Sequence, residues 1–379
     1  MSLVYSQEDR LLRDTAARYL TTASPVESLR KLRDERNIDG FDRTLWLRMA
    51  ELGWTSVMLP AEYGGLDFSY RGLGAIFEET GRNLTASPLF STIVLGASVL
   101  MLAGNKAQKS GNLPLIAAGE LTLALALEEG GHHSPFTIVL RAEKTADGFT
   151  LNGQKTFVID GHSADKLIVV ARTNGDDSSE QGISLFLVAA DTPGIRRNRT
   201  IMVDSRNAAN IHFDNVKVGG NALLGEIDQG SIALDMTLDR GRIFLSAEML
   251  GSAEECFKRT IDYLSEREQF GARIGSFQAL QHRAAIMYTE LQLARSVVMD
   301  AFSAIDENRQ DLARAASLAK AIINDTFNLI VNEAVQMHGG IGVTDELEIG
   351  LFLKRARVAI QILGDAGFHR NRYAKLDGM

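Results

Sequence analysis

The last third of the chain carries four long stretches in which apolar residues recur every three or four positions. That spacing places them along one face of an α-helix, and such a face must be buried against other helices. The four stretches are residues 243–264, 280–305, 323–337 and 349–363. Together they predict a C-terminal four-helix bundle domain over residues 223–379.

Residues 1–120 show a less regular helical periodicity. Ser6 followed by Asp9 is a helix-start signal, because each side chain can accept a hydrogen bond from the backbone amide of the other residue. Pro60 and the Gly64-Gly65 pair interrupt the helical pattern. This region is predicted to be an all-helical N-terminal domain.

Between residues 121 and 222 the pattern changes to short runs of β-forming residues. The runs cover residues 121–127, 136–140, 149–158, 167–170, 183–188 and 211–218. Turn signals occur at Asp147-Gly148 and Asn152-Gly153, and the polar stretch 175–182 is typical of a surface loop. The fold class is therefore α+β: an N-terminal helical domain, a central antiparallel β-barrel or sandwich domain, and a C-terminal four-helix bundle.

Composition and charge argue against several classes of function. The formal net charge is -8, and no cluster of Lys and Arg indicates nucleic-acid binding. No apolar run approaches the roughly 20 residues that span a bilayer, and Met1 opens a polar segment without the core of a signal peptide. We expect a cytoplasmic protein that does not cross a membrane. The single Cys256 is expected to be a small buried hydrophobic residue.

Several short segments occur together in a characteristic order. They are Gly53-Trp54, Pro60-Ala61-Glu62-Tyr63-Gly64-Gly65, Arg267-Glu268-Gln269-Phe270-Gly271, Phe277-Gln278-Ala279-Leu280-Gln281-His282, Gln336-Met337-His338-Gly339-Gly340-Ile341-Gly342 and Lys354-Arg355-Ala356. With these segments the chain resembles the acyl-CoA dehydrogenase family over nearly its whole length.

The resemblance implies FAD as the cofactor. In the family, the matching residues of the bundle bind the diphosphate and adenosine half of the FAD of a neighbouring subunit. Here they are Arg267, Phe270, Gln278, Gln336, Gly339 and Gly340. A planar guanidinium suits a pyrophosphate, and glycines let the backbone approach a ligand closely. The alternative for Arg267 is a surface ion pair with Glu268 or Glu290.

The resemblance also implies a reaction. In the family, a carboxylate removes the α-proton of an acyl-CoA thioester while hydride leaves the β-carbon for the flavin. The substrate residues that match are Ser134, Asp239 and Arg242, and a structural ion pair is the other interpretation of the last two. An electron-transfer flavoprotein as electron acceptor, and a dimer or tetramer, are further implications.

The chain departs from the family pattern around the flavin ring. The family segment Thr-Glu-Pro-Gly-x-Gly-Ser-Asp is replaced by Glu128-Glu129-Gly130-Gly131-His132-His133-Ser134-Pro135. Glu128 therefore stands where a Thr contacts the flavin, and a carboxylate is unfavourable beside a flavin that becomes negative on reduction. The family's Trp-x-Thr is replaced by Phe157-Val158-Ile159, which keeps an aromatic ring and loses a hydroxyl. Adjacent His132 and His133 would point to opposite faces of an extended segment, so no metal site is predicted.

The catalytic base is a second departure. Family members carry a Glu at one of two places, which correspond here to Gly364 and Gly241. Asp365 adjoins the first place and is the candidate base, with a cap or turn as its alternative role. Glu248 lies about 10 Å along a helix from the second place, and an ion pair inside the bundle is its alternative role. His369 belongs to a basic segment that is expected to be solvated or in a subunit contact.

Three functions are compatible with this pattern. The first is FAD-dependent α,β-desaturation of an acyl-CoA thioester by this chain. The second is a catalytically reduced partner subunit that completes the FAD site of another, related acyl-CoA dehydrogenase chain. The third is an acyl-CoA-binding module without redox activity. Family resemblance favours the first function, and the departures at the flavin ring and at the base favour the second.

Overall fold

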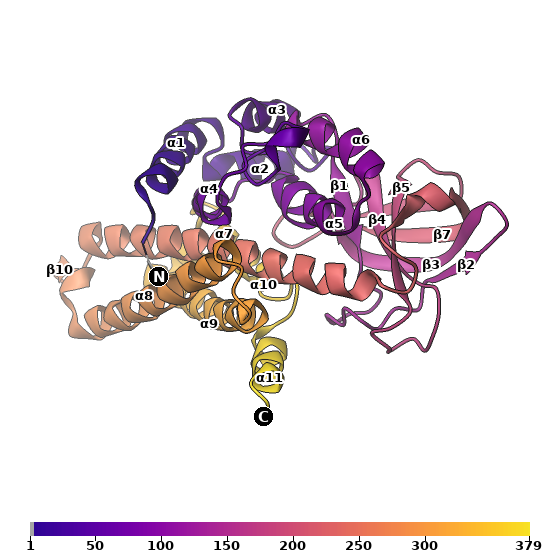
Figure 1. The fold of residues 1–379 in the computed structure, drawn as a ribbon. Helices are drawn as coiled ribbons and strands as arrows, with labels where there is room; N and C mark the ends of the chain where they lie inside the picture. The colour runs from indigo at the N-terminus through magenta and orange to yellow at the C-terminus, as the bar shows by residue number, and fades with distance from the viewer. Residues whose placement is uncertain (1–3) are drawn as a thin grey trace. The chain divides into compact units, whose positions relative to one another are not determined.

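The computed structural model describes residues 4–379 (Figure 1). They form two compact units that interleave along the sequence. The bundle unit comprises residues up to 31, 69–85 and 242–379, and the sheet unit comprises residues 32–68 and 86–241. The expectation about a signal peptide concerns Met1, which lies outside the described residues.

The bundle unit is built from long helices of the C-terminal third. They are α7 (Gly230–Glu266), which begins in the sheet unit, α8 (Gln278–Asp306), α9 (Leu312–His338), α10 (Ile349–Ala359) and α11 (Ala366–Leu376). Helix α9 packs against α8, α10 and α11. Its predicted apolar face is buried, with Ile323, Phe327 and Ile330 fully enclosed. The predicted four-helix bundle is confirmed, although α10 ends before the predicted residue 363.

The N-terminal helices of the bundle unit are α1 (Gln7–Ala23), α4 (Tyr70–Arg82) and the first part of α2 (Val26–Asp34), which ends in the sheet unit. The capping box at the start of α1 is confirmed, because Ser6 and Asp9 exchange hydrogen bonds of 3.1 Å between side chain and backbone. Helix α1 packs against α4. The predicted start of the first helix therefore agrees with the structure, in which Ser6 caps α1.

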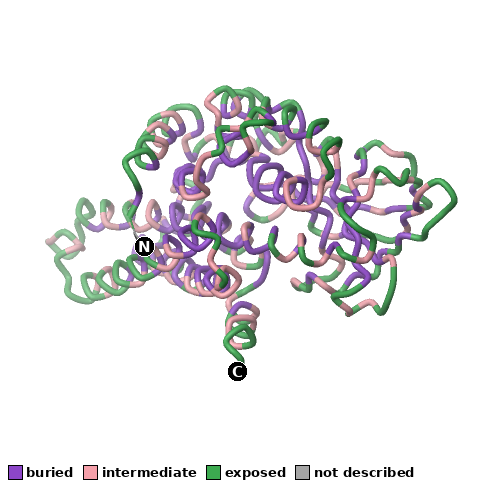
Figure 2. The backbone as a smooth tube through the Cα atoms, in the orientation of Figure 1, coloured by how far each residue is buried: buried purple, intermediate pink, exposed green. Residues whose placement is uncertain are grey.

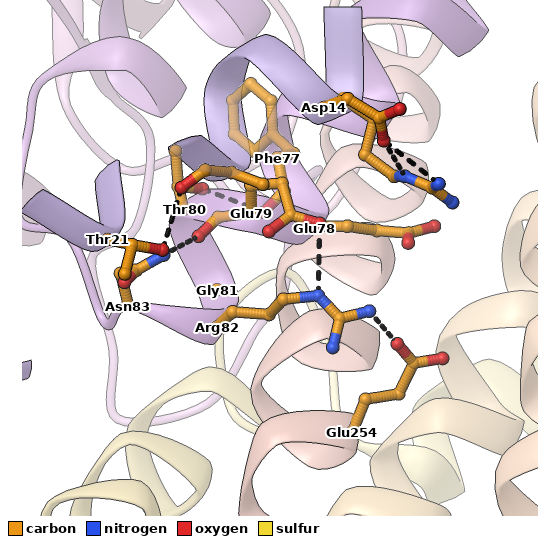
Figure 3. Close-up of polar contacts among 12 residues, drawn as sticks. Asp14, Thr21, Phe77, Glu78, Glu79, Thr80, Gly81, Arg82, Asn83 and Glu254 are labelled. Carbon is orange, nitrogen blue, oxygen red and sulfur yellow. Dashed lines mark hydrogen bonds and ion pairs between the residues drawn. The ribbon is translucent and has the colours of Figure 1, made fainter. Parts of the chain in front are cut away.

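A charged network joins α4 to the long helices of the bundle (Figure 3). Arg82 donates to Glu79 at 3.1 Å and also to Glu254 of α7, which in turn pairs with Arg295 of α8. Glu78 has no exposed surface, and its carboxylate lies 3.7 Å from Arg295. Burial raises the pKa of Glu79. Because each carboxylate has a cationic partner, the network orients α4 without an uncompensated buried charge.

Within residues 4–379, eight strands form the sheet of the sheet unit, in the order β6-β7-β3-β2-β4-β5-β8 with β1 paired to β4. The strands are β1 (Leu123–Ala126), β2 (Arg141–Lys144), β3 (Gly148–Ile159), β4 (Lys166–Arg172), β5 (Ile183–Ala189), β6 (Ile195–Ile201), β7 (Asn207–Gly219) and β8 (Leu223–Leu224). Most neighbours are antiparallel, but β1 and β2 run parallel to β4. The sheet has two ends and is not a closed barrel, so the sandwich form of the prediction is the one that agrees with the structure.

Helices also belong to the sheet unit. They are α3 (Arg43–Glu51), the π-helix η2 (Phe90–Ala97), α5 (Ser98–Ala103) and α6 (Lys106–Ala117). The π-helix packs against β1. The predicted all-helical character of the N-terminal region is confirmed. In the part of the chain that the structure describes, no helix combines the length and the apolar character needed to cross a membrane.

Two local predictions in the sheet unit are wrong. Residues 136–140 form no strand, because the amides of Val139 and Leu140 donate to the carboxylate of Glu129, at 2.7 and 3.0 Å, instead of to a neighbouring strand. Asn152 and Gly153 lie inside β3 at an irregularity of the β3–β7 pairing, not in a turn. Gly153 has a φ of +142°, and a Cβ there would lie 2.9 Å from Leu140 Cα.

Candidate functional site

The residues predicted to bind the diphosphate half of FAD gather at one end of the bundle unit. Arg267 follows α7, Phe270 lies in the turn between β9 (Glu268–Gln269) and β10 (Ala272–Arg273), Gln278 begins α8, and Gln336, Gly339 and Gly340 lie at the end of α9. The ring of Tyr263 stacks on His338 with centroids 4.4 Å apart, which joins the ends of α7 and α9. The tertiary structure therefore brings together residues that are up to 73 positions apart in the sequence, from Arg267 to Gly340.

These side chains are exposed, and the ring of Phe270 lies edge-on to that of Phe277 with centroids 6.4 Å apart. Phe270 is 91 % exposed, and Figure 2 shows the connection between α7 and α8 largely exposed or half-buried. Among residues 4–379, no side chain forms a hydrogen bond or ion pair with Arg267, so its alternative ion pair with Glu268 or Glu290 is not found. A Cβ at Gly339 or Gly340 would meet no atom within 4 Å. An unpaired guanidinium next to open glycine backbone fits an external diphosphate, such as that of FAD.

Gly364, at the first vacated base position, lies in the turn between α10 and α11 and has no room for a side chain. Its φ is +109°, and a Cβ would lie 2.5 Å from Phe368 Cδ1 and 2.9 Å from His369 Nε2. His369 is fully buried, with Nε2 2.9 Å from the carbonyl oxygen of Leu363. The expectation of a solvated or subunit-contact His369 is therefore wrong, because α11 folds back and places the imidazole beneath the turn.

Two buried polar side chains of α9 hold the same turn. The Lys320 ammonium donates to Asn324 Oδ1 at 2.6 Å, to the carbonyl oxygen of Ala359 at 3.1 Å and to that of Gly364 at 3.4 Å. The amide of Asn324 also donates to the Gly364 carbonyl, at 3.3 Å. Burial lowers the pKa of Lys320, and the charges of Arg242 and Arg355 lower it further. No local pattern in the sequence indicates this contact, since a lysine in a helix is usually solvated.

The carboxylates nearest to the vacated base positions have structural partners. Asp365 is exposed and caps α11, where it accepts a hydrogen bond from the amide of Phe368 at 2.8 Å. Glu248 is buried and lies 2.9 Å from the guanidinium of Arg355. Both contacts are the alternative roles that the sequence suggested. The catalytic role of Asp365 stays a prediction.

The substrate residues predicted on α7 are both buried. Asp239 is 3 % exposed and belongs to the sheet unit, and Arg242 has no exposed surface and belongs to the bundle unit. The guanidinium of Arg242 lies 5.8 Å from the ring centroid of Phe368. Gly241, at the second vacated base position, lies within the same helix. Substrate binding by Asp239 and Arg242 stays a prediction.

In the sheet unit, a buried ion pair anchors the loop that follows β1. Lys155 of β3 has no exposed surface and donates to Glu129 at 2.7 Å and to the carbonyl oxygen of Leu127 at 2.9 Å. Burial lowers the pKa of Lys155 to about 8, although the neighbouring Glu129 carboxylate opposes the decrease. Glu129 also accepts the amides of Val139 and Leu140, so one carboxylate holds both sides of the loop.

Glu128, which was predicted beside the flavin ring, has partners within its own loop. Its carboxylate lies 2.5 Å from Nδ1 of His133 and 3.4 Å from the amide nitrogen of Ser134. The Ser134 hydroxyl is exposed and lies 2.7 Å from that of Thr137. Among described residues, no cluster suits a metal ion. The sequence pattern does not indicate the contact between Glu128 and His133, because it forms only when the loop between them folds back.

Phe157 and Ile159 differ in their exposure. Phe157 is 52 % exposed and has a φ of +48°, and its amide donates to Asn210 Oδ1 at 3.2 Å. It lies where the pairing of β3 with β7 shifts, between Lys155 and Val158. A bulky residue with positive φ is strained, and such strain is often found at ligand sites. Ile159 is half-buried and pairs with Ala208 of β7.

The three parts of the fold each match a known protein domain. Residues 6–120 match the N-terminal domain of acyl-CoA dehydrogenases, residues 124–216 match the middle domain, and residues 228–376 match the C-terminal domain. The chain belongs to the acyl-CoA dehydrogenase family, whose members are flavoprotein oxidoreductases. The predicted family and fold class are confirmed. The exact domain boundaries at residues 120 and 222 stay a prediction.

Individual relatives cover nearly the whole chain. Mitochondrial isovaleryl-CoA dehydrogenase of Pongo abelii is 30% identical over 93% of this chain and 84% of its own. The caffeyl-CoA reductase-Etf complex subunit CarC of Acetobacterium woodii is 28% identical over 94% of each chain. Among solved structures, a variant of the Tcur3481-Tcur3483 steroid ACAD is 31% identical, with a TM-score of 0.88 and 98% of each chain covered.

Proposed function

We propose that this chain takes part in FAD-dependent α,β-desaturation of an acyl-CoA thioester as a subunit that completes the FAD site of a related chain. In this proposal, the chain does not itself supply the usual glutamate base. The observation that carries the proposal is the turn at Gly364, where Phe368 and His369 fill the space that a side chain would need. The assembly is a dimer or tetramer that contains a second, complementary chain.

The exposed residues at the end of the bundle unit support the proposal that this chain contributes to the FAD site of a neighbouring chain. Arg267 would bind the diphosphate of a neighbour's FAD, Gln278 and Gln336 would bind the same half of the cofactor, and Gly339 and Gly340 would let the backbone approach it. FAD, when bound, supplies the acceptor for the hydride that leaves the β-carbon. Ser134, Asp239 and Arg242 are the residues of this chain that would orient the acyl-CoA.

The surroundings of Glu248 and Asp365 support the proposal that this chain does not supply the usual catalytic base. A general base needs a carboxylate that can reach the α-proton. Glu248 is held by Arg355, and Asp365 caps α11. If the chain nevertheless desaturates acyl-CoA alone, Asp365 is the base, since it adjoins the vacated position.

The similar proteins support the proposed partners. The name of the Tcur3481-Tcur3483 steroid ACAD joins two designations, which agrees with a site built from two different chains. The name of the caffeyl-CoA reductase-Etf complex subunit associates it with an Etf, which agrees with an electron-transfer flavoprotein as the acceptor for this assembly.

The test is to purify the chain alone, measure bound flavin per chain from the visible spectrum, and measure turnover with a panel of acyl-CoAs. The same measurements follow after co-expression with a related chain that carries the base. We expect little flavin and little turnover from the lone chain, and both in the mixed assembly. Full FAD occupancy and rapid turnover by the lone chain would refute the proposal. Light scattering of the mixed assembly should show a dimer or tetramer, and a monomer at micromolar concentration would contradict a shared site.

A further inference from the structure

The pair formed by Glu128 and His133 organises a loop that bears predicted ligand contacts. The two side chains meet at 2.5 Å, and the imidazole is 4 % exposed while the carboxylate is 21 % exposed. Such a short contact between a carboxylate and a mostly enclosed imidazole ties the start of the loop to its end. The loop closes over only the four residues between them.

The pair also links two other segments of the sheet unit. Beyond the imidazole, the Glu128 carboxylate lies 3.4 Å from the amide nitrogen of Ser134. The carbonyl oxygen of Glu128 accepts a hydrogen bond of 2.7 Å from the amide of Thr156, which directly precedes the exposed Phe157. Glu128 is therefore bonded on one side to the segment with the Ser134 hydroxyl and on the other to the segment with the Phe157 ring.

Each member of the pair contributes to the polar surroundings of the other. Removal of His133 would leave the partly buried Glu128 carboxylate with a long contact to the Ser134 amide and the attraction of the Lys155 ammonium, and removal of Glu128 would take one partner from an enclosed imidazole. By the resemblance, the family has Thr and Gly at these two positions. The two departures from the family pattern thus contact each other, which explains how a carboxylate is accommodated at residue 128.

We propose that Glu128 and His133 form a coupled positioning pair that fixes the Ser134 hydroxyl for the thioester arm of an acyl-CoA. This proposal rests on the proposed function, because it takes acyl-CoA as the ligand of the loop. The pair replaces a shorter hydroxyl and a glycine by two longer side chains that hold each other, so the loop keeps one conformation. Neither residue takes part in proton transfer in this proposal.

The experiment compares four variants of the full chain in its mixed assembly: Glu128→Thr, His133→Gly, the double variant that combines these two substitutions, and His132→Asn. His132 is the matched control, because it is the neighbouring histidine, is exposed, and has no hydrogen-bonding partner among the described residues. Calorimetry measures the dissociation constant of a non-reactive thioether analogue of an acyl-CoA. Amide hydrogen exchange of residues 128–137, with and without the analogue, reports on the loop itself.

Each single substitution is expected to weaken binding of the analogue about tenfold and to speed exchange in the loop, since a charge-assisted hydrogen bond is lost. The double variant should bind within about threefold of the wild type, because it removes both members together. His132→Asn should bind like the wild type.

Three outcomes would overturn the pairing. They are additive losses in the double variant, an equal loss in His132→Asn, and faster exchange in the single variants without any loss of affinity, which would make the pair structural only. If the wild-type assembly does not bind the analogue, acyl-CoA is the wrong ligand for the loop, and this proposal fails with it. A lone chain with full flavin and rapid turnover would refute only the partner-subunit role, because the binding measurements on the loop would keep their meaning.

Discussion

The end of the bundle unit and the loop after β1 both carry residues expected to contact ligands, but their side chains are used differently. At the bundle end, Arg267 and Phe270 are exposed, and no side chain among the described residues pairs with the Arg267 guanidinium. In the loop, Glu128 and Glu129 are each bonded to a basic side chain close by, and Lys155 is completely buried. The bundle end therefore has exposed groups available to a ligand, whereas the polar groups of the loop after β1 stabilise the loop.

This difference separates two requirements of a shared site. A half-site lent to a neighbour needs exposed groups that become satisfied only in the assembly. A half-site kept for the chain's own reaction needs a base and polar contacts that are free to act on the substrate. The bundle end has exposed groups and so meets the first requirement. The turn at Gly364 offers no base, and the Glu128 carboxylate is bonded within its own loop, so these two regions do not meet the second requirement.

The largest effect is expected from restoring a glutamate at the vacated base position. Gly364→Glu should lower the free energy of unfolding by about 4 kcal/mol, because a non-glycine residue at a φ of +109° is strained and its Cβ would overlap Phe368 and His369. Denaturant unfolding checks this. The matched control is Gly111→Ala, since a Cβ there meets no atom within 4 Å and the site lies within helix α6. A stable Gly364→Glu variant that gains turnover would contradict the distinction between the two regions, because it would show that the turn can hold a catalytic base.

The next effect concerns the internal bonding of the loop. The folded-state pKa of Lys155 is about 8, below the ordinary value of 10.5, so the folded chain binds fewer protons than the unfolded chain between these pH values. Stability should therefore rise with pH across this window, by about 3 kcal/mol from this group, and the contribution should level off below about pH 8, where the lysine is protonated in both states. In Lys155→Met, this part of the pH dependence of the free energy of unfolding should disappear. Unfolding measured between about pH 7.5 and about pH 10.5 covers the window and checks this. The exposed Lys106 provides the control Lys106→Met, which should keep the wild-type slope.

The bundle end is tested by removing its guanidinium. Arg267→Ala should weaken FAD binding by the mixed assembly about 10- to 100-fold, the usual range for hydrogen bonds to a charged group, without a change in the stability of the chain. Release of flavin on dilution, followed by fluorescence, measures the affinity. Arg273→Ala removes an exposed arginine of the same hairpin and should have little effect. Equal losses in the two variants would show that the bundle end acts through its overall charge and not through Arg267.

The long helices could be predicted from the sequence, and the edge of the sheet could not. A period of three to four residues repeated over a long stretch leaves little freedom, and the helices were found where it occurs. Strand β6 was missed because this edge strand carries Arg196, Arg197 and Arg199, which obscure the pattern of a half-buried strand. Arg197 donates to the carbonyl oxygens of His162 and Ala164, a role that no local pattern indicates.

The candidate site shows the same limit. The motifs identified residues such as Arg267 and Ser134, because the spacing within a motif is local. The roles of Lys320 in the turn and of His133 in the loop were not predicted, because they depend on contacts made only in the folded chain. Lys320 lies 44 residues from the carbonyl group of Gly364 that it binds. A buried lysine in a helix has the same local sequence signature as an exposed one.

The smallest effect is expected at the candidate base itself. Asp365→Asn keeps an oxygen that can accept the hydrogen bond of 2.8 Å from the Phe368 amide, and Asn caps helices as well as Asp does. The stability should therefore change by less than about 0.5 kcal/mol, whereas Asp365→Ala should lose about 1 kcal/mol with the cap. In the mixed assembly, where the partner supplies the base, turnover with Asp365→Asn should stay within about twofold of the wild type, as measured by stopped-flow reduction of the flavin. Asn preserves the cap and removes only the ability to take a proton. A loss of turnover of about 10²- to 10⁴-fold would therefore identify Asp365 as the base, and would show that the bundle unit supplies its own base, contrary to the comparison.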